Sequence, residues 1–203
     1  MKKLNILSAL FVLFCFEACT KSTDPAVVTP ASTDPKKGSV WVYKSTYYNQ
    51  AGTVTSTNNT TYIGDTLTSG GSVWILLKES VSGLPAVGIQ KRADGWWYVP
   101  FPNVNASLWF KTPAVVGDKY NYNISDGTVD TSKVMNINAT LTVPAGTYTG
   151  CTYIQSFDTN SMEDEYYFLP TGAILMRTGT FDDKVPGPGI YEKQRTELVS
   201  FVQ

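Results

Sequence analysis

The sequence predicts an all-β protein, an antiparallel meander of about ten strands that forms a strongly curved, partly open barrel. Short runs alternate apolar and polar residues, turn residues separate these runs, and helical periodicity is lacking in the region expected to fold. A meander of this size hides its edge strands either by closing into a barrel or by folding into two layers. The alternative fold is therefore a β-sandwich.

Alternation is clearest within 118–125 and 132–143, where apolar residues alternate with Asn, Thr and Lys. This pattern predicts strands with one buried and one solvated face. The runs 39–48 and 72–81 are apolar on both faces, and they predict more deeply buried strands.

Turn signals divide the chain into hairpins, as at SGG (69–71), ADG (93–95) and PAG (144–146). The strand pattern occurs in the ranges 39–48, 53–64, 72–81, 86–92, 95–100, 106–111, 118–125, 132–143, 147–157, 164–169, 173–181 and 190–202. These ranges exceed the expected number of strands by one or two. No period repeats cleanly enough to predict a propeller or a solenoid.

The first residues have the features of an export signal. Lys2 and Lys3 precede an apolar stretch of roughly a dozen residues, too short to span a bilayer core of about 30 Å as a permanent helix. We therefore expect residues 1–18 to be removed as a lipoprotein signal peptide. Residues 19–37, rich in Thr, Ser and Pro, are expected to form a lipid-bearing, disordered tether, and 38–203 a single all-β domain.

The segment FEAC at 16–19 resembles the lipobox of bacterial lipoproteins, in which the cysteine is acylated and becomes the new N-terminus. This resemblance implies that Cys19 carries the lipid, with palmitate among its acyl chains. It also implies anchoring in the cell envelope, on the periplasmic or the surface face of the outer membrane. Phe16 and Glu17 depart from the most common lipobox, so cleavage at another position is the alternative.

Composition excludes several classes of function. The chain has no histidine, which removes Ser-His and Cys-His nucleophile activation and the usual zinc or iron ligand sets. The 16 basic and 17 acidic residues nearly balance, so no basic surface for nucleic acid is expected. Of the three cysteines, Cys19 and Cys151 would remain after processing, which leaves no internal disulfide. We expect no cofactor, no metal ion and no catalytic residue.

The C-terminal half resembles a group of envelope lipoproteins of unknown function from Bacteroidota-type bacteria. The likeness rests on VPAGTY at 143–148, on the aromatic segment 166–174 with its Pro-x-Gly turn, and on LVSF at 198–201. These motifs are typical of β-hairpin turns. Pro144 ends one strand, and Gly146 supplies the positive φ that lets the chain reverse into the next strand. The resemblance implies the fold and the compartment, and it brings no activity or functional residue.

The densest aromatic cluster supplies the predicted ligand contacts: Trp96, Trp97, Tyr98 and, further along the chain, Trp109. Along a strand, Trp96 and Tyr98 face one way and Trp97 the other, so at least one large ring is expected on the less buried face. An exposed ring there is suited to stacking on a sugar ring or an acyl chain. The alternative is that these rings pack in the core.

Two other groups invite a chemical interpretation. Cys151 lies in a predicted strand without a basic neighbour, which predicts a buried, unreactive thiol. The acidic run at 163–165, with Asp158 before it, has the residue types of a glycosidase or a calcium site. Because this segment has no glycine for the sharp turn of a calcium loop, we interpret it as a solvated hairpin tip.

These observations favour a non-enzymatic, lipid-anchored envelope protein that binds an apolar or glycan ligand or serves as an accessory part of an outer-membrane protein assembly. The first alternative is an enzyme that acts on glycans with carboxylates alone, and the second is a structural surface lipoprotein without a ligand. An aromatic-lined cavity without converging acids would favour ligand binding. Two carboxylates about 5 to 10 Å apart in one cleft would favour the enzyme, and a filled core the structural role.

Overall fold

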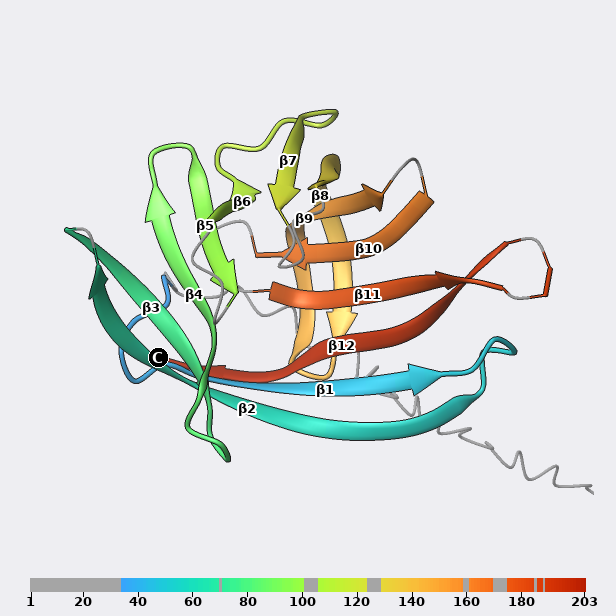
Figure 1. The fold of residues 1–203 in the computed structure, drawn as a ribbon, viewed down its shortest axis with the longest axis horizontal. Coiled ribbons are helices and arrows are strands. Elements are labelled where there is room, and N and C mark those ends of the chain that lie inside the picture. Colours follow the sequence, from blue (N-terminus) through green and yellow to red (C-terminus); the bar gives the residue numbers. More distant parts are fainter. Residues whose placement is uncertain are drawn as a thin grey trace, which may run out of the picture.

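The structure is a computed structural model that describes residues 34–69, 71–100, 106–123, 129–158, 161–169, 175–184, 186–187 and 189–203. Twelve antiparallel strands form one sheet that curls into a nearly closed barrel (Figure 1). The predicted all-β, partly open barrel is confirmed. The sandwich alternative does not apply, because one sheet contains all twelve strands.

Strands adjacent in the chain are adjacent in the sheet, whose order is β6-β5-β4-β3-β2-β1-β12-β11-β10-β9-β8-β7. Two meanders, β1 to β6 and β7 to β12, are thus joined where β1 pairs with β12. The strands are β1 Val40–Tyr48, β2 Val54–Ser69, β3 Ser72–Glu79, β4 Pro85–Arg92, β5 Gly95–Pro100, β6 Ser107–Lys111, β7 Lys119–Asn123, β8 Val129–Val143, β9 Gly146–Asp158, β10 Ser161–Phe168, β11 Leu175–Asp183 and β12 Ile190–Val202.

Every range with the strand pattern contains a strand, so the expected number of about ten was too low. Three strands extend beyond their predicted ranges by three residues or more: β2 continues to Ser69, β8 begins at Val129 and β10 begins at Ser161. The additional residues include Thr, Ser, Asp and Glu, which weaken the apolar pattern. Backbone pairing, as between Thr66 and Ile75, nevertheless keeps such residues in the sheet.

The barrel is nearly closed where the two edge strands, β6 and β7, approach each other. Each of them pairs on one side, β6 with β5 and β7 with β8. Side chains bridge the seam: the Tyr120 hydroxyl donates to the Trp109 carbonyl oxygen at 3.3 Å, and Lys111 Nζ lies 2.8 Å from Asp118 Oδ2. Side chains, not a β-ladder, therefore hold this seam.

Large apolar side chains pack in the interior of the barrel. The Phe110 ring of β6 stacks on Phe168 of β10, with ring centroids 4.8 Å apart and planes 7° from parallel. Because β6 and β10 are far apart in the sheet order, this contact spans the interior. The buried core consists of Trp41, Tyr43, Leu77, Ile89, Trp96, Tyr98, Phe110, Val134, Leu141, Val143, Tyr148, Cys151, Ile154, Phe168, Leu169, Met176 and Leu198.

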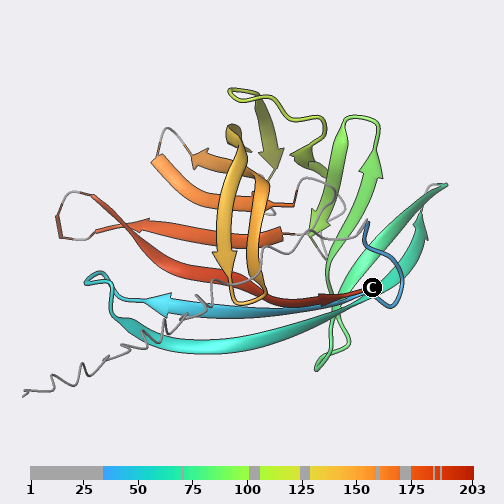
Figure 2. The same ribbon diagram turned by 180° about the vertical axis from the view of Figure 1, so that it is seen from behind.

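The β8–β9 hairpin reaches toward β12, as the view from behind shows (Figure 2). Three register shifts interrupt its ladder, and such irregularities bend a hairpin. At its tip the Ala145 N–H donates to the Leu198 carbonyl oxygen at 3.0 Å. The predicted turn is confirmed, since β8 ends at Val143 and β9 begins with Gly146 at a φ of 134°.

The described chain begins and ends at the same end of the barrel (Figure 1). The Gln203 side-chain amide donates to the Asp34 carbonyl oxygen at 2.8 Å, and the Asp34 carboxylate lies 2.9 Å from Lys91 Nζ. The following loop crosses β2 at Gly64, where a Cβ would lie 2.6 Å from the Lys36 carbonyl oxygen. The last residues of the predicted tether therefore contact the barrel.

We expect Gly95→Ala to lower the free energy of unfolding by about 2–4 kcal/mol. Gly95 has a φ of +147°, and a Cβ there would lie 2.2 Å from the Phe110 carbonyl oxygen on β6. Gly52→Ala is the matched control, because Gly52 has a φ of +76° and nothing within 4 Å of a Cβ. The control should lose about 1 kcal/mol in urea unfolding. Equal losses in both variants would show that the close approach to β6 is not what costs stability.

Candidate functional site

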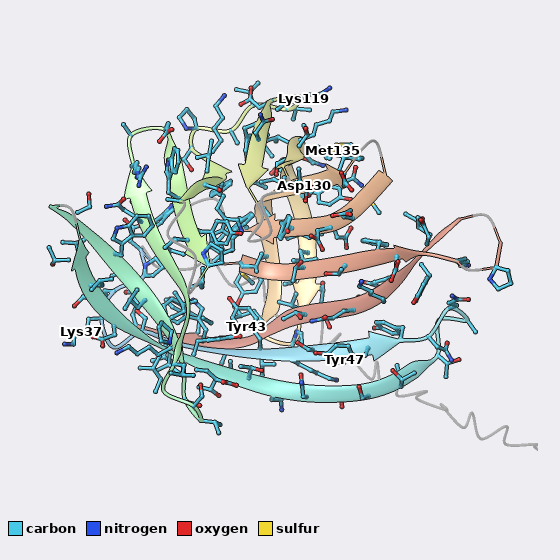
Figure 3. The ribbon with its side chains drawn as sticks, in the orientation of Figure 1. Lys37, Tyr43, Tyr47, Lys119, Asp130 and Met135 are labelled. Atoms are coloured by element: carbon cyan, nitrogen blue, oxygen red, sulfur yellow. The ribbon has the colours of Figure 1, made fainter. Side chains whose placement is uncertain are left out.

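A hollow of about 400 Å³ opens between β1, β2 and β12 on one side and β3, β4 and β6 on the other. We refer to it as the interior pocket; two of its residues, Tyr43 and Tyr47, are labelled on β1 in Figure 3. Its described lining residues are Tyr43, Ser45, Tyr47, Asn58, Thr60, Tyr62, Leu77, Ala86, Val87, Trp109, Leu175, Gln194 and Thr196.

Strand alternation and register build one polar wall of the interior pocket. Tyr43, Ser45 and Tyr47 are alternate residues of β1 and therefore face the same side of the sheet. Cross-strand pairing places Thr60 opposite Tyr43, and Asn58 opposite Ser45, on β2. Hydroxyl and amide groups from two strands thus meet on one surface.

The third strand of this wall is β12, and its polar groups are already hydrogen-bonded. Ser45 Oγ lies 2.8 Å from Thr196 Oγ1, and the Gln194 amide donates to the same hydroxyl at 3.2 Å. The Tyr43 hydroxyl donates to the Leu175 carbonyl oxygen at 3.0 Å. These bonds fix the side chains at the centre of the wall.

Asn58 and Thr60 differ from these residues. Within the described part of the chain, neither the Asn58 amide nor the Thr60 hydroxyl has a hydrogen-bond partner. Both side chains line the interior pocket and are open to solvent. They are among the polar groups of this wall that remain available to a ligand.

The opposite wall is apolar. Leu77 of β3 and Val87 of β4 are cross-strand partners, and Ala86 of β4 and Trp109 of β6 add to the lining on this side. Leu175 of β11 contributes a further apolar side chain beside Tyr43. The interior pocket therefore has one wall that forms hydrogen bonds and one that offers apolar contact.

Trp109 owes its position to a β-bulge. Between Phe110 and Leu108 the ladder with β5 skips Trp109, so this residue is the extra one of a bulged strand. The bulge lets Trp109 and Phe110, which are adjacent in sequence, both contact Phe168. The Trp109 ring stands at 88° to the Phe168 ring, with centroids 5.0 Å apart, which fixes its orientation in the pocket wall.

The Tyr43 and Tyr62 phenols of the interior pocket stay protonated at neutral pH. Burial raises the pKa of Tyr43 above its usual value, and the neighbouring Tyr62 adds to this effect. Burial also raises the pKa of Tyr62, with smaller contributions from Glu79 and Tyr47. These hydroxyl groups are therefore neutral hydrogen-bonding groups rather than bases.

None of the described residues that line the interior pocket carries a charge at neutral pH. General acid–base catalysis and nucleophilic attack need groups that gain or lose a proton near neutral pH. The described lining residues suit reversible binding better than either reaction.

The structure separates the four predicted ligand contacts. Trp109 lines the interior pocket, and Tyr98 supports it from behind, with ring centroids 5.7 Å apart. Trp96 and Tyr98 are core residues, 4% and 8% exposed. They are not among the described lining residues of the interior pocket, and they pack in the core.

Trp97 faces the other way, as alternation predicted. Its indole N–H donates to Asp94 Oδ1 at 2.9 Å, and the Arg92 guanidinium lies 4.2 Å from its ring centroid. One face of the ring is thus covered by a cation. A ligand contact at Trp97 stays a prediction.

Sequence reasoning missed the polar wall of β1, β2 and β12. The range 39–48 was predicted to be apolar on both faces and 53–64 only to be a strand, whereas Ser45 shares a face with Trp41 and Tyr43 of the core and lies opposite Asn58. The available signal was strand alternation, because Trp41 and Ser45 are separated by an even number of positions on one strand.

The predictions for the two cysteines have different outcomes. Cys151 is buried, at 0% exposed, and burial raises the pKa of its thiol to about 11. The predicted unreactive thiol is supported by both observations. Cys19 lies outside the described residues, so its lipidation stays a prediction.

The interpretation of residues 163–165 as a solvated tip is wrong for Glu165. This residue is 8% exposed and its carboxylate lies 2.8 Å from Arg177. Gly179 makes room for the pair, since a Cβ there would lie 3.0 Å from Glu165 Cγ and from Glu192 Oε1. The error arose because Arg177, distant in sequence, neutralises the carboxylate.

Other carboxylates converge near the β9–β10 hairpin, away from the interior pocket. Burial raises the pKa of Glu163, and Asp130, Asp158 and Asp164 raise it further. Figure 3 shows Asp130 well separated from Tyr43 of the pocket. Among the described residues, no group of three or more Cys, Asp or Glu side chains has the arrangement of a metal site.

A second hollow, of about 440 Å³, lies where the chain crosses β2 near Gly64. Its Asp65 carboxylate lies 2.6 Å from Lys78 and 3.6 Å from Lys37. The hydrogen bond from Lys78 holds the pKa of Asp65 at about 2, with Thr66 contributing. Because its central charge is already paired, this hollow is the weaker candidate for a ligand.

Comparison with protein-family models, with curated proteins and with solved structures finds no match to this chain. The resemblance to Bacteroidota-type envelope lipoproteins therefore stays a prediction from the motifs. Within the described residues, no helix is long and apolar enough to cross a membrane.

The two adjacent tryptophans should differ in their contribution to stability. We expect Trp96→Ala to lower the free energy of unfolding by about 3–5 kcal/mol, because it removes a buried ring. Trp97→Ala should lose about 1 kcal/mol, the scale of a cation–π contact. Urea unfolding of both variants measures this difference. Losses on the core scale in both variants would exclude Trp97 as a ligand platform.

Proposed function

We propose that this protein is a non-enzymatic, lipid-anchored protein of the cell envelope that binds a small apolar or glycan ligand in the interior pocket. The observation that carries the proposal is a pocket of about 400 Å³ with aromatic and hydroxyl walls and no charged group among its described lining residues. Its volume lies within the range of small-molecule sites. Service as an accessory part of an outer-membrane assembly is compatible with such binding.

The pocket weighs against the two rival functions. A glycosidase needs two carboxylates on either side of one cleft. Glu165 is instead engaged with Arg177, and the acids around Glu163 do not line the interior pocket. A purely structural protein would be expected to fill its interior, whereas part of this interior is open.

The proposed anchor suits the position of the pocket. The described chain begins at residue 34, and β1 then runs from Val40 through the pocket residues to Tyr48. At about 3.3 Å per residue, Tyr47 lies about 23 Å from Val40. The Tyr47 end of the pocket is therefore distant from Lys37, at the end that the tether joins (Figure 3).

The anchor is tested with Cys19→Ser. We expect this variant to move from the membrane fraction to the soluble fraction, because it lacks the thiol that would be acylated. Cys151→Ala serves as the control and should stay with the membrane, since this thiol is buried. Membrane association of Cys19→Ser would contradict lipidation at this residue.

Ligand binding is tested by filling the pocket. Thr60→Trp places a large ring in the interior pocket, while Thr61→Trp places the same ring on the opposite face of β2. Wild type and Thr61→Trp should bind palmitate or an oligosaccharide in calorimetric titration, and Thr60→Trp should bind about tenfold more weakly or not at all. Bound oligosaccharide should be recovered uncleaved. Equal binding by both variants, or none by wild type, would contradict the proposal.

A further inference from the structure

We propose that the interior pocket selects a neutral sugar, a mono- or disaccharide unit, over an acyl chain or a charged ligand. This inference rests on the proposed function and narrows it to one class of ligand. Its basis is the pairing of one hydrogen-bonding wall with one apolar wall around a space without charge.

The polar wall disfavours an acyl chain. Asn58 and Thr60 have no hydrogen-bond partner among the described residues, and both line the pocket. A hydrocarbon that covered them would remove their water and offer no hydrogen bond in return, which is costly. Sugar hydroxyl groups can donate and accept, so they match the Asn58 amide and the Thr60 hydroxyl.

The apolar wall suits the other side of a sugar ring. Pyranose rings carry C–H groups on their faces and hydroxyl groups around their rim, and aromatic side chains bind such faces. The Trp109 ring lines the pocket and is held by Phe168 and Tyr98, at centroid distances of 5.0 and 5.7 Å. A ring that is already fixed loses little conformational entropy on binding.

The lack of charge among the described lining residues disfavours acidic and phosphorylated ligands. An anion in the pocket would lose water without gaining a Lys or Arg partner there. Burial raises the pKa values of Tyr43 and Tyr62, so these phenols are neutral and add no charge to the pocket. The same argument applies to the carboxylate of a fatty acid.

The size of the pocket limits the ligand further. A volume of about 400 Å³ is near the lower end of the range for small-molecule sites. It suits one short unit rather than a polymer bound along the whole barrel. The units of a longer glycan would extend past Tyr47, where β1 approaches its end.

The test first screens wild-type protein for binding to neutral, acidic and phosphorylated oligosaccharides on an array and to palmitate. Calorimetry then measures the affinity of each ligand that binds. Asn58→Leu and Thr60→Val remove hydrogen-bonding groups from the pocket. Their neighbours on the opposite face of β2 supply the controls Asn59→Leu and Thr61→Val, which make the same chemical changes outside it. Thermal melts confirm that each variant folds.

We expect neutral oligosaccharides to bind wild type and both controls, and to bind Asn58→Leu and Thr60→Val about tenfold more weakly. Preference for palmitate or for a charged oligosaccharide, lost in Thr60→Trp, would overturn this inference and leave the proposed function standing. Neutral-sugar binding that is equal in pocket variants and controls would overturn it too, because the sugar would lie elsewhere. If wild-type protein binds neither oligosaccharides nor palmitate, both proposals are overturned.

Discussion

The contact between Phe110 and Phe168 is the interaction on which the closed shape depends. The sheet order leaves β6 and β7 at its two ends, and no ladder joins them. The Lys111–Asp118 pair at the seam is partly exposed, and solvent weakens such pairs by screening. Removing a buried Phe ring costs about 3–5 kcal/mol. The aromatic packing across the interior, rather than the seam, therefore holds the sheet in its curved form.

The interior pocket lies where this packing ends. Along β1, the same face of the strand changes from Trp41 and Tyr43, which are core residues, to Ser45 and Tyr47. The long strands β1, β2, β11 and β12 continue beyond the region that the β8–β9 hairpin reaches (Figures 1 and 2). On the same strands, the side chains of the inner face thus change from large aromatic rings to the polar groups of the interior pocket.

The sequence was sufficient for the fold because two-residue periodicity and turn chemistry are local. Pairing between strands that are far apart in the sequence, such as β1 with β12, cannot be read from local patterns. The site depends on this pairing, so its residues could not be predicted as a group. Ser45 and Asn58 carry no signal of a site in the sequence, and only the register places them beside each other in the pocket wall. Trp109 was among the predicted contacts, yet its place in the pocket wall depends on a bulge. Glu165 was misjudged because its partner, Arg177, lies on the next strand.

The open polar groups of this wall bear on its role. Asn58 and Thr60 are open to solvent and their side chains have no hydrogen-bond partner among the described residues, so these groups contribute little to the stability of the barrel. Binding sites commonly retain groups that folding does not need. Hydrogen-bonding groups that stabilise no described part of the barrel, set opposite a fixed tryptophan, are what a sugar-binding surface requires.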